Sequence, residues 1–353
     1  MEDREILQRA AAQMIAWYAA SRRVLPWRES PTPYHVWISE IMLQQTRIEA
    51  VIPYYERFLR ELPDVASLAA VDEDRLMKLW EGLGYYSRAR NLRKAARQIM
   101  AEYGGELPRR AGELKKLPGI GDYTAGAIAS VAYGEPEPAV DGNVLRVLSR
   151  LLAFEDDVMD PKTRRRVTEQ LRAVYPAGKD AALLTEGIME LGETVCIPNG
   201  EARCGVCPLR ALCRAHADDS VERYPVKAPP RPRRIEERTV LLLRCGDRWA
   251  IRRRPNKGLL AGLWEFPSEA AALRAEEAAA RVPGALGCSA CGEAAHIFTH
   301  VEWNMRGYVI DCAELLPGFQ WVTAAELRER YPVPTALRYY QKVLESCSKE
   351  DCR

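Results

Sequence analysis

The amino-acid sequence predicts two domains, of which the first is nearly all helical and the second mixes α-helices with β-strands. With 353 residues, the chain exceeds what one hydrophobic core ordinarily organises. Residues 224–238, rich in proline and arginine, cannot continue a helix and predict an extended linker. The hydrophobic pattern also differs on the two sides of this stretch. These observations place the first domain at residues 1–223 and the second at residues 239–353.

The segments before the linker have the spacing of amphipathic helices. Apolar residues recur every three or four positions over residues 4–20 and 75–103. Beyond the linker, residues 239–254 and 305–315 alternate like β-strands, and residues 270–282 form a short alanine-rich helical pattern. No apolar run approaches the length that spans a bilayer, so we expect no membrane association.

Four cysteines lie close together at the end of the predicted helical domain, in the order C-x7-C-x2-C-x5-C. They are Cys196, Cys204, Cys207 and Cys213. Soft thiolate ligands in one short segment indicate a metal site or an iron–sulfur cluster. A zinc ribbon usually uses two separated C-x2-C pairs, whereas this segment has one such pair with a single cysteine on either side. The spacing therefore favours a [4Fe-4S] cluster, and the alternatives are a structural zinc site and thiols that cluster by coincidence.

Composition and charge bear on the cellular compartment of the protein and on its possible contacts with phosphate. The first residues, MEDREILQRAAAQM, lack the composition of a targeting segment, and the other cysteines are scattered, so we expect a cytoplasmic protein. The formal net charge of +2 by itself argues neither for nor against nucleic-acid binding. Five basic residues without an acidic neighbour do lie between Arg88 and Arg97. Such a run suits either phosphate contacts or a solvated helix face.

A pair of glycines precedes a helical pattern of small residues in the segment L-P-G-I-G, residues 117–121. Gly119 and Gly121 permit a tight turn and leave backbone N–H groups at the N-terminus of the next helix, where a phosphate can bind. The segment therefore predicts a helix-hairpin-helix DNA-binding element. A generic glycine-rich turn is the alternative.

Two carboxylates are candidates for chemistry because of their surroundings. Glu40 lies in W-I-S-E-I-M-L-Q-Q-T, an otherwise uncharged stretch, and Asp141 lies between two apolar residues and a new helical pattern. A lone carboxylate among apolar neighbours tends toward a raised pKa and general-acid function. Asp141 fits a helix N-cap, a catalytic carboxylate, or both. A solvated glutamate and a plain N-cap are the alternatives.

A series of motifs in the same order resembles the adenine DNA glycosylases of the MutY family, within the endonuclease III-like helix-hairpin-helix superfamily. In the predicted first domain the motifs are L-P-W-R (25–28), S-E-I-M-L-Q-Q-T (39–46), E-G-L-G-Y-Y-S-R (81–88), L-P-G-I-G (117–121), V-D-G-N (140–143), E-G-I-M-E-L-G (186–192) and the four cysteines. In the second they are G-L-L-A-G-L-W-E-F-P (258–267) and F-T-H (298–300). The resemblance covers about residues 5–345.

The resemblance implies a fold and a reaction. The fold is an all-α helix-hairpin-helix glycosylase domain with an iron–sulfur loop, followed by an α+β Nudix-like domain. The reaction is excision of adenine opposite 8-oxoguanine or guanine in double-stranded DNA, which requires flipping the adenine out of the stack. Glu40 corresponds to the general acid that protonates N7 of adenine, and Asp141 to the carboxylate that stabilises the oxocarbenium-like sugar. Tyr123 and Asn143 correspond to residues that position these groups.

Further site residues follow from the same resemblance. The adenine pocket corresponds to Leu25, Trp27, Arg28 and Glu186. Residues that contact DNA correspond to Gln45, Leu83, Tyr85, Gly119 and Gly121. Recognition of 8-oxoguanine corresponds to Phe298, Thr299 and His300. The family also implies a [4Fe-4S] cofactor on the four cysteines and a monomer associated with the bacterial nucleoid through DNA.

Tyr123 separates two neighbouring chemistries. Endonuclease III-like enzymes that cleave the strand have lysine at this position, two residues after the second hairpin glycine, and its amine forms a Schiff base. A tyrosine cannot do so, and we therefore expect a monofunctional glycosylase without strong lyase activity. One rival is an endonuclease III-like glycosylase and lyase for oxidised pyrimidines. Another is a non-enzymatic iron–sulfur protein that scans DNA, but such a binder would need neither Glu40 nor Asp141.

The sequence departs from the usual patterns in three places. A Nudix catalytic helix needs a dense set of glutamates to hold magnesium, and residues 268–282 offer only Glu269, Glu276 and Glu277, which argues against a diphosphatase. The first cysteine gap has seven residues where six is commoner in the family. Thr299 occupies a position more often held by serine. Neither of the last two departures removes a ligand or a hydroxyl group.

Overall fold

The computed structural model describes residues 1–229 and 232–350. The chain forms two units, of which the first comprises residues 1–70 and 91–229. The second comprises residues 71–90 together with the described residues that follow Pro229. Residues 71–90 therefore pack with the C-terminal part of the chain, which the sequence pattern does not indicate. The predicted boundaries at residues 223 and 239 stay a prediction, and residues 230, 231 and 351–353 of the predicted linker and second domain lie outside the described part.

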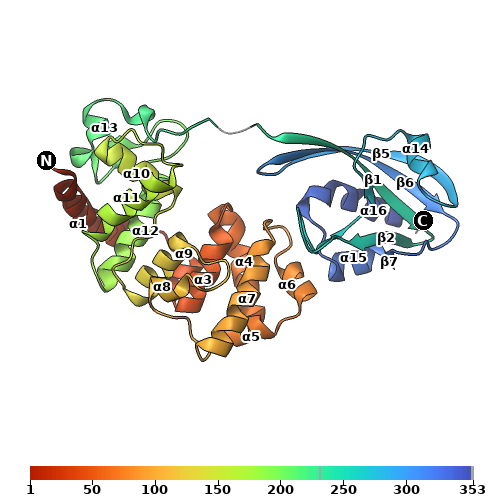
Figure 1. Ribbon diagram of the computed structural model, residues 1–353, viewed down its shortest axis with the longest axis horizontal. Helices are drawn as coiled ribbons and strands as arrows, with labels where there is room; N and C mark the ends of the chain where they lie inside the picture. Colours follow the sequence, from red (N-terminus) through yellow and green to blue (C-terminus); the bar gives the residue numbers. More distant parts are fainter. Residues whose placement is uncertain (230–231, 351–353) are drawn as a thin grey trace. The chain divides into compact units, whose positions relative to one another are not determined.

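The first unit is built from helices (Figure 1). Its α-helices are α1 (Asp3–Ser21), α2 (Pro26–Glu29), α3 (Pro33–Leu43), α4 (Ile48–Glu61), α5 (Val65–Ala70), most of α7 (Ser87–Glu102), α8 (Ala111–Leu114), α9 (Asp122–Ala127), α10 (Gly142–Leu152), α11 (Pro161–Arg172), α12 (Lys179–Thr194) and α13 (Arg214–Ala217). A π-helical turn, η1 (Ile128–Ala132), continues α9, and the short 3-10 turns are η2 (Cys204–Val206), η3 (Arg210–Leu212) and η4 (Val221–Arg223).

Helices of the first unit gather in two groups (Figure 1). In one group, apolar faces of α1, α10 and α12 form a core that includes Met14, Leu148 and Leu191, each at most 4% exposed. In the other, α3 packs on α4 and η1, and Trp37 and Ile38 are fully buried. Burial of these faces supplies most of the stability of such helices, because isolated helices of this length are marginal in water.

The predicted helix over residues 75–103 is interrupted in the structure. α6 (Glu73–Leu79) and α7 are separated by residues 80–86. Gly82, Gly84 and Tyr85 have positive φ angles of 104°, 70° and 46°. Such angles end a right-handed helix, and glycine adopts them at little cost. The helical prediction is wrong for this short loop, which we call the Tyr85 loop (residues 80–86).

The second unit contains a mixed sheet (Figure 1). In the described residues seven strands contribute, in the order β3-β2-β1-β6-β5, with β4 also paired to β1 and β7 to β2. They are β1 (Arg234–Cys245), β2 (Arg248–Arg253), β3 (Trp264–Glu265), β4 (Ser268–Glu269), β5 (Ala285–Ile297), β6 (Val301–Cys312) and β7 (Gln320–Val322). Strands β1 and β6 run parallel from Arg234↔Val301 to Arg244↔Asp311, and the other pairs are antiparallel. Helices α14 (Ala275–Ala280), α15 (Ala324–Arg330) and α16 (Arg338–Glu350) and the turn η5 (Thr335–Leu337) complete the unit.

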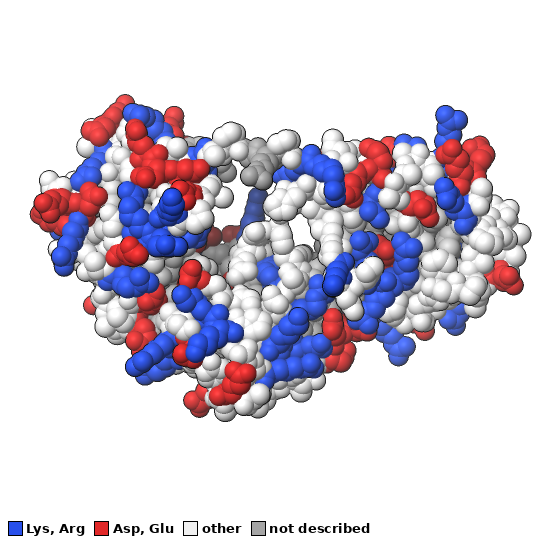
Figure 2. All heavy atoms as spheres, in the orientation of Figure 1, with Lys and Arg blue, Asp and Glu red and all other residues white. Residues whose placement is uncertain are grey.

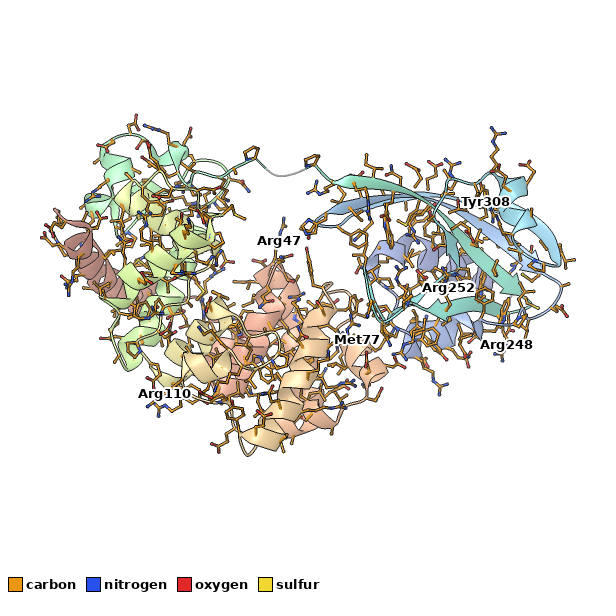
Figure 3. All side chains as sticks on the ribbon, viewed as in Figure 1. Arg47, Met77, Arg110, Arg248, Arg252 and Tyr308 are labelled. Carbon is orange, nitrogen blue, oxygen red and sulfur yellow. The ribbon has the colours of Figure 1, made fainter. Side chains whose placement is uncertain are left out.

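Both faces of β1 are covered, which explains its continuous apolar run. Val240 and Leu242 pack in one core, and Leu241 and Leu243 pack in another on the opposite face. This alternation is the two-residue period of a strand. In the second core the hydroxyl of Tyr308, labelled in Figure 3, donates to the Leu273 carbonyl at 3.0 Å.

The structure confirms the predicted fold class and corrects its details. The strand pattern over residues 239–254 is divided into β1 and β2, because Gly246, with φ 59°, allows a tight turn. Strand β1 starts at Arg234, inside the stretch predicted as a linker, where β6 supplies a pairing partner. Helix α14 is shorter than the pattern over residues 270–282. Within residues 1–229 and 232–350, no helix has both the length and the apolar composition needed to cross a membrane.

Candidate active site and nucleic-acid interface

Glu40 and Tyr123 meet in the first unit although 82 residues separate them in the sequence. Helix α3 begins after Thr32, whose hydroxyl caps it by accepting from the His35 N–H at 3.2 Å, and it carries Glu40 near its end. Tyr123 lies in the first turn of α9. Its hydroxyl donates to Glu40 Oε2 at 2.7 Å and contacts Met189 Sδ at 3.2 Å. The two residues therefore form one hydrogen-bonded pair.

The surroundings of Glu40 favour its protonated form. Removal from water raises the pKa of its carboxyl from 4.5 to about 7. The hydrogen bond from Tyr123 lowers this pKa, the negative charges of Asp141 and Glu186 raise it, and the positive charge of Arg28 lowers it. Desolvation outweighs the other contributions. A carboxylic acid with a pKa near neutrality can hold a proton and give it up at physiological pH.

Asp141 caps helix α10 and lies close enough to Glu40 to affect its charge. Its Oδ1 accepts from the Val144 N–H at 2.8 Å, and its Oδ2 accepts from the Asn143 side-chain amide at 2.9 Å. Burial raises the pKa of Asp141, whereas these hydrogen bonds lower it. The N-cap and the candidate catalytic carboxylate predicted from the sequence are thus the same side chain in the same conformation.

A charged cluster lies beside Glu40. The Arg28 guanidinium pairs with Glu190 at 2.9 Å and approaches Glu186 at 3.6 Å. It also stacks on the Tyr18 ring, 5.4 Å from the ring centroid, and the Tyr18 hydroxyl donates to Glu186 at 3.2 Å. Burial raises the pKa of Glu186, and this effect exceeds the lowering caused by the positive charge of Arg28. Glu190 is the most buried of the three charged side chains, at 3% exposure, against 10% for Arg28 and 18% for Glu186.

Two members of this cluster are absent from the prediction. Glu190 follows Glu186 by four residues on α12, so the helical spacing within E-G-I-M-E was a usable signal. Tyr18 on α1 had no signal beyond an apolar position of a helix. Leu25 and Trp27, which are predicted for the adenine pocket, lie close to Arg28 in the chain. Both are buried, with exposed fractions of 5% and 6%.

The four cysteines of the loop between α12 and α13 line one small cavity. None of the four forms a disulfide. No group of three or more His, Cys, Asp or Glu side chains in the described part of the chain has an arrangement that would hold a metal ion. Arginines anchor the loop: Arg150 Nη1 lies 3.3 Å from Cys196 Sγ, and Arg146 Nε donates to the Cys196 carbonyl at 2.8 Å. Arg146 also donates to Asn143 Oδ1 at 2.8 Å, which joins the loop to the Asp141 site.

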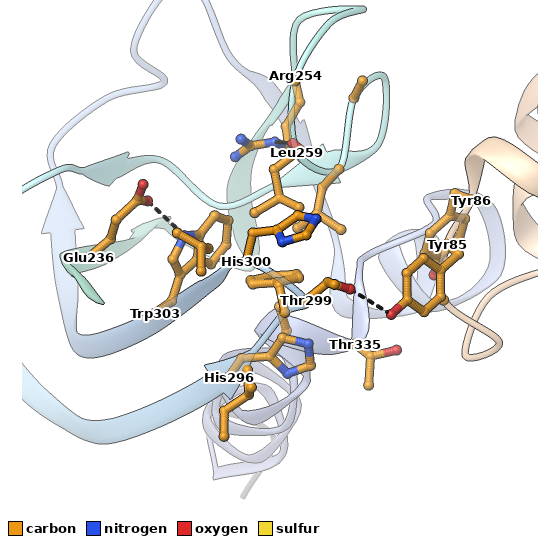
Figure 4. Close-up of a pocket in the computed structure, with 18 of the residues that line it drawn as sticks. Tyr85, Tyr86, Glu236, Arg254, Leu259, His296, Thr299, His300, Trp303 and Thr335 are labelled. Carbon is orange, nitrogen blue, oxygen red and sulfur yellow. Dashed lines mark hydrogen bonds between the residues drawn. The ribbon is translucent and has the colours of Figure 1, made fainter. Parts of the chain in front are cut away.

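In the second unit a cavity of about 770 Å³ includes the three residues predicted for lesion recognition (Figure 4). Phe298 packs edge-on against Trp303 with ring centroids 4.9 Å apart. The Trp303 indole donates to Glu236 at 2.9 Å, and the hydroxyls of Thr299 and Tyr85 lie 3.1 Å apart. His300 also lines the cavity. The sequence order separates Tyr85 from these residues, but packing brings them together.

The residues predicted to contact DNA differ in exposure. Gln45 and Tyr85 are exposed and have positive φ angles of 58° and 46°, which are uncommon for residues other than glycine. Such strain often marks functional positions. Leu83 is buried at 7% exposure, so it is not presented to solvent in this structure. Gly119 has φ 81°, and a Cβ there would lie 2.7 Å from Asn91 Cβ; Gly121 immediately precedes α9.

The basic residues from Arg88 to Arg97 differ in their exposure and in their hydrogen-bond partners. Arg88 is 8% exposed and therefore does not belong to a solvated helix face. Arg90 donates to the Ala261 carbonyl at 2.7 Å, and the exposed Arg97 donates to the Ala69 carbonyl at 3.0 Å. On the face drawn in Figure 2, Lys and Arg side chains form several groups, and Asp and Glu side chains lie among them. This agrees with the small net charge of +2.

Comparisons with known proteins identify the families that the chain resembles. Residues 38–176 match the family model of the HhH-GPD superfamily base excision DNA repair proteins, and residues 239–342 match a NUDIX domain. Adenine DNA glycosylase of Rattus norvegicus is 32% identical, over 96% of this chain and 78% of that protein. The human adenine DNA glycosylase is also 32% identical, over 96% of this chain and 74% of that protein.

Solved structures resemble the first part of the chain. A thermostable thymine-DNA glycosylase matches 61% of this chain and 98% of its own, with a TM-score of 0.55 and 25% identity. A non-covalent endonuclease III–DNA complex matches 62% of this chain and 99% of its own, with a TM-score of 0.53 and 26% identity. The helical fold with its hairpin, the added Nudix-like unit and the similarity over nearly the whole chain lead to one assignment: the chain belongs to the adenine DNA glycosylase family.

Proposed function

We propose that this protein excises adenine paired with 8-oxoguanine or guanine in double-stranded DNA by hydrolysing the N-glycosidic bond. The observation that carries the proposal is the Glu40–Tyr123 pair, in which a desolvated carboxyl with a pKa near 7 is held by a hydroxyl at 2.7 Å. The names of the relatives identify adenine as the nucleobase in this proposal. The geometry supplies an acid suited to protonating it.

The reaction uses the two carboxyl groups in different protonation states. Glu40 donates its proton to N7 of the flipped adenine, so the C1′–N9 bond breaks with its electron pair leaving on a neutral base. The ionised Asp141, fixed by N–H donors from Val144 and Asn143, stabilises the positive sugar. Water then adds to C1′, and the Glu40 carboxylate takes the proton that water releases. An abasic site remains.

Tyr123 acts as a positioning residue in this scheme. Its hydroxyl fixes one oxygen of Glu40 and leaves the other free to face the base. A phenol provides no amine, so no Schiff base with the sugar forms at this position. The charged cluster of Arg28 and Glu186 next to Glu40 would contact the adenine, in keeping with the family pattern.

The second unit is proposed to recognise the oxidised base. The 770 Å³ cavity combines aromatic walls, from Phe298 and Trp303, with the hydroxyls of Thr299 and Tyr85. 8-Oxoguanine differs from guanine by an N–H at position 7 and a carbonyl at position 8. A hydroxyl whose proton is already donated, as one of the Thr299–Tyr85 pair is, can accept from this N–H but cannot donate to N7 of guanine. Gln45 and Tyr85 would enter the stack beside the mismatch.

The cysteine loop suits a [4Fe-4S] cluster. Each thiolate of such a cluster binds a different iron, so its sulfurs are spaced more widely than those around one zinc ion, where each Zn–S bond is only about 2.3 Å. Four cysteine side chains that line one small cavity support this choice. Cys196, Cys204, Cys207 and Cys213 would hold the cluster. The bound cluster would cross-link the loop that Arg146 and Arg150 connect to helix α10.

Metal analysis tests the cofactor directly. Protein purified without oxygen should be brown and contain about four irons per chain. Replacement of Cys207 by serine should lower the iron content, whereas replacement of Cys245, which lies outside the loop, should not. Stoichiometric zinc in place of iron would contradict the assignment.

A single-turnover assay on four duplexes tests the function. Adenine is placed opposite 8-oxoguanine, guanine, cytosine or thymine in otherwise identical DNA. We expect excision to be fastest opposite 8-oxoguanine and slower opposite guanine, with strand breaks only after alkali or heat. Equal rates on all four duplexes, or breaks without alkali, would contradict the proposed substrate or the proposed monofunctional chemistry.

A further inference from the structure

The Tyr85 loop is held in an unusual conformation. Tyr85 has φ 46° and is 49% exposed, so an aromatic side chain is presented to solvent from a left-handed backbone. Side chains on such a backbone are strained, and the conformation persists only where neighbouring groups impose it. The flanking glycines, Gly82 and Gly84, permit the turn but cannot fix it, because glycine is the most flexible residue.

Arg88 supplies the groups that fix this turn. Its Nη2 donates to the carbonyl oxygens of Leu83 at 2.9 Å and Gly84 at 3.1 Å, and its backbone N–H donates to the Tyr85 carbonyl at 2.9 Å. Its guanidinium stacks on Trp80 and Tyr85, at 5.3 Å and 5.8 Å from the ring centroids. The Trp80 indole donates to the same Gly84 carbonyl at 3.1 Å. One planar cation therefore contacts both the main chain and the aromatic ring of the loop.

Burying the guanidinium of Arg88 costs solvation free energy, which interactions inside the protein must offset. Its side chain is in the protein interior, and burial lowers its pKa to about 10. A buried guanidinium is desolvated and must be compensated by hydrogen bonds and π faces, and the loop that carries Tyr85 supplies two carbonyl oxygens and two aromatic rings. The other side of Tyr85 faces the cavity, where its hydroxyl meets Thr299 at 3.1 Å.

We propose that Arg88 is a positioning residue for lesion recognition: it holds the Tyr85 ring at the edge of the Thr299 cavity and thereby sets the preference for 8-oxoguanine over guanine. The inference rests on the proposed function, because it assigns Arg88 an effect exerted only through Tyr85. It also explains why this arginine lies inside the protein although the basic run around it suggests phosphate contacts.

A double-mutant cycle in the full-length protein tests the inference. The measured quantity is the ratio of the dissociation constants for two duplexes that carry 2′-fluoro-2′-deoxyadenosine, which resists excision, opposite guanine or 8-oxoguanine. Arg88→Met should lower this preference roughly fivefold to tenfold, the size of one or two lost hydrogen bonds, with little change in affinity for the guanine duplex. Tyr85→Ala should lower it at least as much. The double variant should match Tyr85→Ala within about twofold.

Controls separate positioning from general damage. Arg97→Met removes a charge and a main-chain hydrogen bond from the same helix without touching the Tyr85 loop, and it should leave the preference unchanged. If Arg88→Met does not fold, as judged by iron content and thermal unfolding, Arg88→Lys provides the same comparison, since lysine retains the charge without the planar fork.

Each outcome has a distinct meaning. An unchanged preference in the Arg88 variants, with a lowered one in Tyr85→Ala, overturns the inference while the proposed function stands. Effects that multiply in the double variant also overturn it, because Arg88 would then act independently of Tyr85. A parent protein without any preference for 8-oxoguanine contradicts the proposed function, and the inference fails with it.

Discussion

The candidate active site and the candidate recognition cavity are built in contrasting ways. Around Glu40, side chains from α3, α9, α10 and α12 converge, and Asp141 is fixed by two hydrogen bonds. Around Thr299, by contrast, three predicted residues follow one another in a single connection between β5 and β6. The acid site is assembled from distant helices, whereas the recognition cavity combines the β5–β6 connection and the Tyr85 loop with strands β1 and β6, which carry Glu236 and Trp303.

This difference follows from what each site must do. Raising the pKa of a carboxyl to about 7 requires removing much of the water around it, which several packed elements achieve together. Reading a base requires groups that solvent and DNA can reach, and loops present such groups. Changes around Glu40 should therefore affect chemistry and stability strongly, and changes around Thr299 should affect selectivity mildly.

The largest effect is expected from Glu40→Gln. The amide keeps the shape but cannot deliver a proton, so the single-turnover rate of adenine excision should fall about a hundredfold to ten-thousandfold. If chemistry and recognition are separate, binding to the 8-oxoguanine duplex should survive. Gel-shift titrations and quenched-flow assays measure the two quantities. Near-native excision by this variant would remove Glu40 from the mechanism.

The same substitution should change stability in a pH-dependent way. Because the folded protein holds the Glu40 proton more tightly than the unfolded chain, the stability due to this proton is present below pH 4.5 and lost as pH rises through about 7. Glu40→Gln should thus stabilise the protein at pH 8 by roughly 2 to 3 kcal/mol, and much less near pH 4.5. Denaturant unfolding at both pH values gives this difference. Thr299→Ala is the matched control and should show no such pH dependence.

Tyr123→Phe should shift the pH profile of excision. The hydroxyl of Tyr123 lowers the pKa of Glu40, so its removal raises that pKa, and activity that needs the protonated acid should extend to higher pH. A hydrogen bond to a charged group corresponds to about one pH unit in the alkaline midpoint. Single-turnover rates from pH 5 to pH 9 measure it. A midpoint that moves to lower pH would mean that Glu40 is not the group being titrated.

The smallest effect is expected at Thr299. Loss of its hydroxyl in Thr299→Ala should weaken the preference for 8-oxoguanine over guanine by about 0.5 to 1.5 kcal/mol, and adding Phe298→Ala should weaken it further. Thr299→Ser keeps the hydroxyl and is the matched control. Unchanged rate ratios in both alanine variants would show that this loop does not read the lesion.

Point substitutions are a sharper test than removal of the second domain. Residues 71–90 pack with the C-terminal part of the chain. Asp74 pairs with Arg253 at 3.1 Å, and the Glu81 carboxylate accepts from the Val333 N–H at 2.9 Å. A truncation near Glu237 would therefore also release the Tyr85 loop, and loss of selectivity could not be assigned to the recognition cavity alone.

Much of the site was readable in the sequence because its signals are local. Asp141 preceding a helical pattern predicts an N-cap, and four cysteines within one short segment predict a shared ligand. The uncharged neighbours of Glu40 predict a raised pKa, and the structure shows the burial that causes it. Glu190 could have been found by its four-residue spacing from Glu186, whereas Tyr18 could not, since nothing in its own segment distinguishes it from a core tyrosine.

The sequence by itself determined the two kinds of domain, the cysteine loop, the N-cap at Asp141 and the absence of an amine at position 123, because each depends on residue type and short-range spacing. Only the tertiary structure decided that residues 71–90 pack with the second unit and that Arg88 is buried with its guanidinium against the Tyr85 ring. It also decided that Tyr123 donates a hydrogen bond to Glu40. These features depend on contacts between residues far apart in the chain. Burial and hydrogen bonding across such distances are properties of the packed molecule, and no local pattern specifies them.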